Sequence, residues 1–266
     1  MARIALNALV GFLVGIAGGL VGLGGAELRL PYLIGFLRLS PHAAVRINLA
    51  ISLIVIVAAL PVRGMKLPGL DLRAHLPEVI GIAAGAVLAA YFGAGALRRL
   101  SPDALARIIA TLLIMLGIGL LIEAATGPVS AGLLPDSATI RLPAALTFGI
   151  VIGLISSLLG VAGGEVIIPT LVFGYGIPIK AAGSLSLLIS LPTVLMGLAR
   201  HAWSGGLSNV NVLQRLIVPM GVGAALGAML GGSIVGVAPE GVLKVGLGVL
   251  LIWSAWKVWT SHRSEG

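Results

Sequence analysis

Two glutamates interrupt otherwise apolar sequence, and they are the residues best suited to chemistry inside a membrane. Glu27 and Glu165 stand 138 positions apart, each directly after a glycine-rich stretch. A carboxylate in a low-dielectric cavity binds a proton more readily, and a nearby bound anion strengthens this tendency. Protonation would then be linked to anion occupancy, as a proton-coupled anion carrier requires. Alternatively, each carboxylate only caps its own interrupted helix, because the helix dipole favours an anion there.

The glycines before these glutamates are expected to break a helix at membrane depth. Glycine inside a helix costs about 1 kcal/mol relative to alanine. A helix that restarts after the break exposes free backbone N–H groups and the positive end of its dipole. Two such ends facing each other would bind an anion with few cationic side chains. The residues predicted to form this part of a substrate site are Gly24, Gly25, Gly163 and Gly164.

Arg29 is the only lysine or arginine well inside the first apolar unit of either half, and Ile167 takes its place in the second half. Two interpretations stay open. Arg29 forms a buried ion pair with Glu27, or its planar guanidinium binds a sulfonate-like head group directly.

The next apolar unit of each half carries a further polar pair. Arg46 and Asn48 correspond to Ser184 and Ser186 in the second half. These four residues either line the same cavity or hold neighbouring helices together through polar contacts. We include them in the predicted substrate site.

Composition decides the class of protein. The 266 residues are 58% hydrophobic and only 10% charged, with a mean hydropathy of +1.13. Long runs are apolar around the whole helix, which leaves no face for water. The fold class is therefore an all-α polytopic membrane protein. Without cysteine or histidines at ligand spacing, we expect no metal site and no cofactor.

The net charge of +8 is expected to set membrane orientation and not to bind nucleic acid, because few aromatic residues accompany the basic ones. Arg63, Lys180 and Lys244 are among the charges that we assign to loops. Glu78 follows Pro77, and we expect it to favour the dipole at a helix start.

The sequence is internally repeated. Gly11 aligns with Gly149, and the register continues without a gap to Leu60 and Leu198. We predict a first membrane repeat at 1–123, a linker at 124–140 and a second repeat at 141–266. Each repeat has about four helical units, the first one broken or re-entrant at its glycines. The predicted units span about 5–37, 43–62, 75–95, 103–123, 141–174, 181–200, 213–235 and 240–259.

Whether the first unit of each repeat crosses the membrane or re-enters is left open by the sequence. A crossing unit would make the two repeats parallel, and a re-entrant hairpin would make them inverted. A leader peptide is not expected at the N-terminus, because residues 11–23 belong to the repeat.

These motifs resemble the sulfite exporter TauE/SafE family, also described as a sulfonate-uptake permease family. The resemblance covers essentially the whole chain. It depends on glycine-rich breaks that end in proline, on a small-residue helix start, on an Arg-His pair followed by two glycines, and on small residues after a later proline. The segments concerned are Gly22–Pro31, Gly160–Pro169, Lys180–Ser184, Arg200-His201 with Gly205-Gly206, and the stretch after Pro219. Glutamate after the glycines, and Arg46 in place of a small residue, depart from the common pattern.

The resemblance implies a secondary transporter, exporter or permease, in the plasma (inner) membrane, mostly of bacteria. Its substrates would be sulfite, sulfonates such as sulfoacetate, or related small organic anions. The expected partners are that small anion and the lipid bilayer, and a homodimer is left open. Two alternatives remain: a cation-coupled or channel-like permease in which Glu27 and Glu165 hold a cation, and a non-transporting membrane scaffold. An enzyme is not expected, because no catalytic constellation occurs and the glycine stretch lacks the lysine of a phosphate loop.

Overall fold

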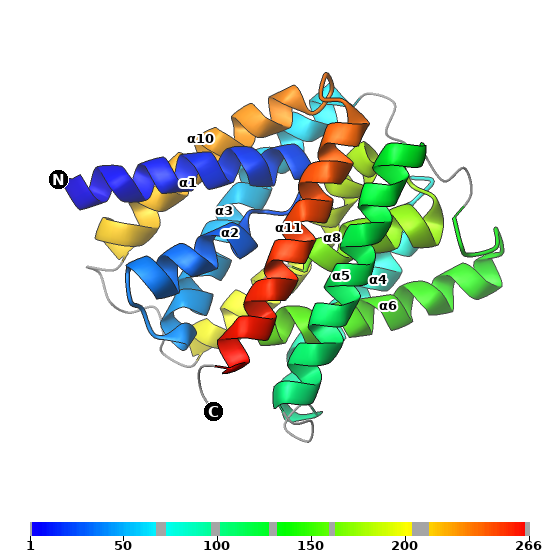
Figure 1. The fold of residues 1–266 in the computed structure, drawn as a ribbon, viewed down its shortest axis with the longest axis horizontal. Coiled ribbons are helices and arrows are strands. Elements are labelled where there is room, and N and C mark those ends of the chain that lie inside the picture. Colours follow the sequence, from blue (N-terminus) through cyan, green and yellow to red (C-terminus); the bar gives the residue numbers. More distant parts are fainter. Residues whose placement is uncertain are drawn as a thin grey trace.

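The computed structural model describes residues 2–67, 73–96, 102–127, 132–159, 163–203 and 213–263, and for some residues inside its helices, Glu27 among them, only the backbone. Every regular element in these ranges is helical (Figure 1). The helices of the first half are α1 (Ala2–Val21), α2 (Ala26–Pro31), the π-helical turn η1 (Tyr32–Phe36), α3 (Pro41–Lys66), α4 (Leu76–Ala96) and α5 (Pro102–Thr126). Those of the second half are α6 (Ala138–Leu159), α7 (Gly164–Pro169), η3 (Thr170–Gly174), α8 (Ile179–Trp203), η4 (Leu213–Ile217), α10 (Val218–Ile234) and α11 (Glu240–Arg263).

Within the described ranges, five helical segments are long and apolar enough to cross a membrane. They are Arg3–Val21, Ala43–Lys66, Ala138–Ser156, Ile179–Ala199 and Arg215–Ile234. Large apolar side chains also cover the outside of the helices. Leu13, Val57, Ile80 and Leu226 are each 57–62% exposed, as expected where the surrounding solvent is lipid. The prediction of an all-helical protein with several membrane-spanning helices is confirmed.

Helices α1 and α10 lie side by side because glycines let their backbones touch (Figure 1). A Cβ atom added to Gly15 would stand 2.3 Å from the carbonyl oxygen of Ala224, and one added to Gly19 would stand 2.3 Å from that of Ala228. Contacts that advance by four residues on both helices mean that α1 and α10 run in the same direction.

Helices α4 and α6 pack in the same way. A Cβ atom added to Gly149 would stand 2.2 Å from the carbonyl oxygen of Ile82, and one added to Gly153 would stand 2.4 Å from that of Ala86. This pair is also parallel. In both pairs, the helix that opens one half packs against the third long helix of the other half.

Helices α3 and α8 are antiparallel. Arg63, near the end of α3, donates a hydrogen bond to the carbonyl of Lys180 at the start of α8. Near the start of α3, Leu49 lies against Gly197 in the last third of α8. Helices α5 and α11 are antiparallel as well, and an ion pair joins the end of α5 to the start of α11. The two halves of the chain are therefore interleaved.

Candidate functional site

The first apolar segment is interrupted at its glycine-rich stretch. Helix α1 ends at Val21, and α2 begins only at Ala26. Between them Gly22, Gly24 and Gly25 have φ angles of +94°, +75° and +69°, which residues with a side chain rarely adopt. In the second half α7 begins directly after Gly163, whose φ is +80°. Each short helix thus starts after a left-handed glycine.

The two breaks meet inside the protein. A Cβ atom added to Gly164, in the second break, would stand 3.2 Å from the Cα of Leu23, in the first. The same atom would stand 3.3 Å from the hydroxyl oxygen of Ser186 on α8. A Cβ atom on Gly22 would be 2.3 Å from the carbonyl oxygen of Gly183, also on α8. We call the place where the two breaks meet, at Leu23 and Gly164, the crossing. The start of α8 packs against it through Gly183 and Ser186.

Arg29 lies beside the first break and is fully buried. Its Nε donates to Oδ1 of Asn48 at 3.0 Å, and one terminal nitrogen donates to the hydroxyl of Ser52 at 2.6 Å. Asn48 in turn donates to the carbonyl of Ala26 at 3.1 Å, which ties α3 to the start of α2. The other terminal nitrogen of Arg29 would be 3.4 Å from a Cβ atom on Gly25. The structure therefore brings Arg29, Asn48 and the glycines together.

Glu165 is the buried acidic group of the second break, with 3% of its surface exposed. Its Oε1 accepts a hydrogen bond of 2.9 Å from the hydroxyl of Ser254 on α11. Ser254 is not among the predicted site residues, because nothing in the pattern of α11 indicates which helix its hydroxyl faces. The side chain of Glu27 lies outside the described residues, and so does the ion pair with Arg29 that was one of the two interpretations of Arg29.

The remaining predicted residues lie on α3 and α8. Ser186 is fully buried, and its hydroxyl has no hydrogen-bond partner among the residues that the structure describes. The hydroxyl of Ser184 accepts from Nε of Arg63 at 3.0 Å and also lies 3.3 Å from the Lys180 carbonyl. Arg46 is partly exposed and lies two positions before Asn48, so it projects from a different side of α3.

Comparison with known proteins gives the family. The sequence model of the sulfite exporter TauE/SafE family matches residues 6–258. The chain belongs to this family. The probable membrane transporter protein YunE of Bacillus subtilis (strain 168) is 23% identical over 245 residues, which cover 85% of this chain and 86% of that protein. No solved structure gives a significant match. Together with its apolar helices, membership of the TauE/SafE family makes the chain a multi-pass membrane transporter.

Arg63 has a role in this TauE/SafE protein that differs from the expected one. It is fully buried, so its assignment to the loop charges is wrong. Its guanidinium donates to the carbonyls of Gly19 and Leu20 at 2.8 and 2.7 Å. Because α1 stops at Val21, its last carbonyls have no partner within the helix. Arg63 supplies that partner and links the end of α1 to α8.

Lys244 is a second buried cation that we assigned to a loop. It is 4% exposed, and its Nζ lies 2.7 Å from Oε1 of Glu123 on α5, so that assignment is also wrong. A lysine is stable inside an apolar bundle when a carboxylate pairs with it. Parts of the family resemblance, including Gly160 and Gly205-Gly206, lie outside the described residues.

Proposed function

We propose that this TauE/SafE family member is a secondary transporter, exporter or permease, for sulfite, sulfonates such as sulfoacetate, or related small organic anions. It would act in the plasma membrane of a bacterium. One observation carries the proposal: the two backbone breaks meet, with Leu23 against Gly164 and the Ser186 hydroxyl beside them. Interrupted helices that meet inside a transporter are the usual place for its substrate.

The chemistry at the crossing suits an oxyanion. The hydroxyl of Ser186 can donate a hydrogen bond to a substrate oxygen. The guanidinium of Arg29 is oriented by Asn48 and Ser52 and lies beside Gly25. A planar guanidinium binds sulfonate-like oxygens with two parallel hydrogen bonds. The proposed site therefore combines backbone from both breaks with one hydroxyl and one guanidinium.

The helix directions support two inverted repeats over the predicted segments 1–123 and 141–266. Ile54 and Val62 of α3 contact Gly221 and Gly232 of α10, so α3 runs parallel to α10 and hence to α1. The chain must then return between α1 and α3, along α2 and η1. This favours a re-entrant first unit, and the antiparallel α3 and α8 fit repeats of opposite orientation.

Glu27 and Glu165 are the proposed proton-coupling groups. Glu165 is buried in the first turn of α7, next to Gly164, where a change in its protonation would change the charge that a bound anion meets. The alternative is a cation-coupled permease. The carboxylate of Glu165 and the hydroxyl of Ser254 are both oxygen ligands, and they lie 2.9 Å apart.

Flux into proteoliposomes tests the proposal. We expect uptake of labelled sulfite or sulfoacetate to respond to an imposed pH gradient. The Glu27→Gln/Glu165→Gln protein should still bind substrate but lose that response. If no sulfur-containing anion moves under any gradient, the substrate assignment is wrong.

Arg29→Ala separates the two coupling models. An anion carrier should lose transport, because the proposed site binds the anion through the guanidinium beside Gly25. A cation site should tolerate this change and instead lose ion binding with Glu165→Gln. Size-exclusion chromatography of each variant shows whether the protein is folded before flux is compared.

A further inference from the structure

The two broken segments, α2 with η1 and α7 with η3, have equivalent outer ends, η1 and η3, which lead back to the next long helix. Leu33 in η1 corresponds to Leu171 in η3 in the repeat register, and both side chains are fully buried. Their carbonyls accept equivalent hydrogen bonds, from Leu39 at 3.1 Å and from Ile177 at 3.0 Å. The two outer ends therefore share a backbone arrangement, so their attachments to the rest of the protein can be compared directly.

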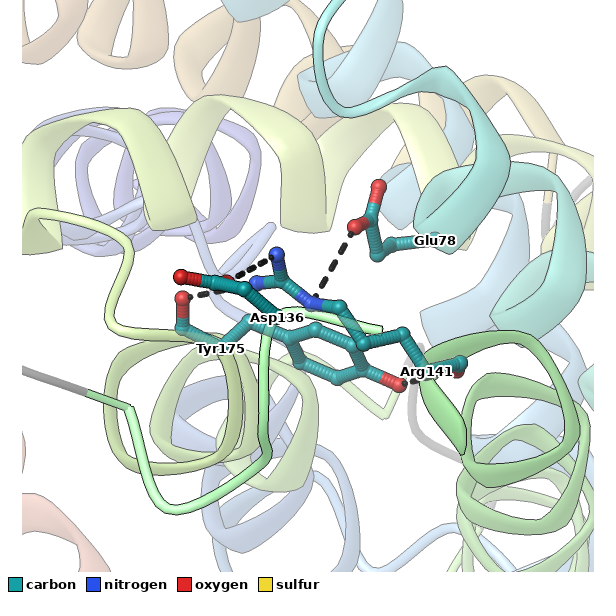
Figure 2. Close-up of polar contacts among 4 residues, drawn as sticks. All are labelled: Glu78, Asp136, Arg141 and Tyr175. Carbon is teal, nitrogen blue, oxygen red and sulfur yellow. Dashed lines mark hydrogen bonds and ion pairs between the residues drawn. The ribbon is translucent and has the colours of Figure 1, made fainter. Parts of the chain in front are cut away.

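Arg141 of α6 attaches the outer end of the second segment (Figure 2). One terminal nitrogen donates to the carbonyl of Tyr175 at 3.1 Å, and the Tyr175 hydroxyl donates to the carbonyl of Arg141 at 3.1 Å. Figure 2 shows the guanidinium over the Tyr175 ring, 5.3 Å from its centre. The other terminal nitrogen donates to Oδ1 of Asp136 at 2.8 Å, and Nε faces Oε1 of Glu78 on α4 at 3.6 Å. We call these four residues the arginine latch, which joins the end of η3 to α4 and α6.

The stretch before α6 adds a backbone attachment to η3. The amide of Leu133 donates to the carbonyl of Phe173 at 2.8 Å, and that of Leu134 donates to the carbonyl of Gly174 at 3.0 Å. A Cβ atom added to Gly132 would stand 2.7 Å from the carbonyl oxygen of Gly174, so the two backbones touch. These bonds must break before η3 can move away, which raises the free energy of local opening.

A neutral network holds the outer end of the first segment. The hydroxyl of Tyr32 donates to Oδ1 of Asn7 at 2.7 Å, and the Asn7 amide donates to the carbonyl of Arg215 at 3.1 Å. The side chains of η1 are also less covered. Ile34 is 41% exposed, whereas Val172, at the corresponding place in η3, is 7% exposed. Segments with less buried apolar surface open at a lower free energy, so η1 is the more easily released end.

The two outer ends lie at opposite ends of α3. The carbonyl of Leu33 accepts from Leu39, immediately before α3 begins. Lys180, shortly after Tyr175, accepts a hydrogen bond from Arg63 near the end of α3. The 26 residues of α3 span about 39 Å at 1.5 Å per residue, and this helix is long and apolar enough to cross a membrane. The unequal attachment is therefore a difference between the two faces of the membrane.

We propose that the first broken segment is the gate of the crossing, and that the arginine latch holds the second segment closed. Without substrate, the crossing then opens at the face where α3 begins. Opening at the other face requires Arg141 to leave Tyr175. The inference rests on the proposed function, because it takes the crossing as the place of the substrate, but the opening itself can be measured without substrate or flux.

Cysteine labelling measures this opening, because the sequence contains no cysteine of its own. Leu33→Cys and Leu171→Cys are a matched pair of single reporters, at equivalent and fully buried positions. A water-soluble maleimide should modify Leu33→Cys at least about 10-fold faster than Leu171→Cys, since one further hydrogen bond to a charged group corresponds to such a factor. The labelling rates of both proteins after denaturation correct for differences in thiol reactivity.

Variants of the latch test its part in the difference. In the Leu171→Cys protein, Arg141→Gln should raise the labelling rate by about 10-fold, because it removes the charged hydrogen bonds of the latch. Tyr175→Phe removes only the hydroxyl that donates to the Arg141 carbonyl, so it should give a smaller increase and serves if Arg141→Gln does not fold. Tyr32→Phe is the matched control, which should accelerate labelling of Leu33→Cys but not of Leu171→Cys.

Three outcomes overturn the proposal. The first is labelling of Leu171→Cys as fast as, or faster than, that of Leu33→Cys. The second is a Leu171→Cys rate that neither latch variant changes. The third is equal acceleration of both reporters by a latch variant, because the latch would then only stabilise the whole fold. If labelling follows the expectation but no sulfur-containing anion is transported, the proposed substrate is wrong and the unequal attachment stands.

Discussion

The two breaks share a backbone conformation but differ in the side chains around it. Gly25 before α2 and Gly163 before α7 are both left-handed. Arg29 follows the first break and hydrogen-bonds to α3, whereas Ile167 takes the corresponding place after the second, where Glu165 hydrogen-bonds to α11. Among the described side chains, one break therefore carries a buried cation and the other a buried carboxylate. The two breaks therefore have similar backbone conformations but present side chains of opposite charge.

The largest effect on folding is expected from a substitution that adds a side chain at Gly22 in the first break. Gly22→Ala places a methyl group 2.3 Å from the carbonyl oxygen of Gly183, at a φ of +94°. Because α1 and α8 must separate to accommodate it, we expect little folded protein. Gly24→Ala is the control, since its φ of +75° is also unfavourable but its nearest neighbour is 3.9 Å away. That change should cost only about 1–2 kcal/mol. Size-exclusion profiles and thermal midpoints measure both, and equal losses would show that contact with α8 is unimportant.

The next largest effect is expected on transport, when Arg29, the buried cation beside the first break, is replaced. Arg29→Lys keeps the charge but cannot reproduce the fork that reaches Asn48 through Nε and Ser52 through a terminal nitrogen. We expect transport to fall by about 10-fold to 100-fold, which corresponds to 1.4–2.7 kcal/mol. Ile167→Leu, at the corresponding place after the second break, is the matched control and should leave transport nearly unchanged. Full activity of Arg29→Lys in proteoliposomes would mean that charge alone suffices.

Two serine substitutions, one beside each break, test whether the two breaks have different roles. Ser52→Ala removes an acceptor from Arg29, and Ser254→Ala removes the donor to Glu165. Each should lower the free energy of unfolding by about 1–3 kcal/mol, because a buried charged group loses a hydrogen bond. If Glu165 exchanges a proton during transport, only Ser254→Ala should change the pH dependence of uptake. An equal pH response in both variants would remove Glu165 from the coupling step.

The helices and their interruptions could be predicted from local sequence. A long run of apolar residues predicts a membrane helix whatever the helix packs against. Glycine predicts its end because glycine can adopt the left-handed backbone conformation without steric cost. The predicted first unit, 5–37, overlaps α1, α2 and η1, although α1 begins earlier, at Ala2. Asn48, which follows the break by α2, η1, a loop and about two turns of α3, donates to the carbonyl of Ala26 at the start of α2.

Long-range partners could not be predicted. In the sequence, Arg63 lies near the end of an apolar run, where a charged residue usually belongs to a loop. Only the packing of α3 against α1 and α8 shows that it caps α1. The pairing of Lys244 with Glu123 is hidden for the same reason, since 121 residues separate them. Charge positions are visible in one sequence, but the neighbour of each charge is decided by tertiary packing.

The smallest predicted effect is on the free energy of unfolding. It concerns the hydrogen bond that Tyr175 makes at the end of the second broken segment. After η3, the hydroxyl of Tyr175 donates to the carbonyl of Arg141 at 3.1 Å, just as Tyr32 in η1 donates to Asn7 at 2.7 Å in the first segment. Burial, assisted by the charge of Glu78 and opposed by that of Arg141, raises the pKa of Tyr175 from 10.0 to about 12.

Above pH 10 the unfolded chain releases the Tyr175 proton while the folded protein keeps it, so the free energy of unfolding falls as the pH rises toward about 12. Tyr175→Phe cannot ionise and should show a smaller fall over this interval, after losing about 1 kcal/mol at pH 8 with its hydrogen bond. Denaturation midpoints of both proteins from pH 8 to about 12 measure the difference. Parallel curves would mean that Tyr175 is no more protected than in the unfolded chain, and that the second segment is held by the Arg141 guanidinium and its backbone contacts alone.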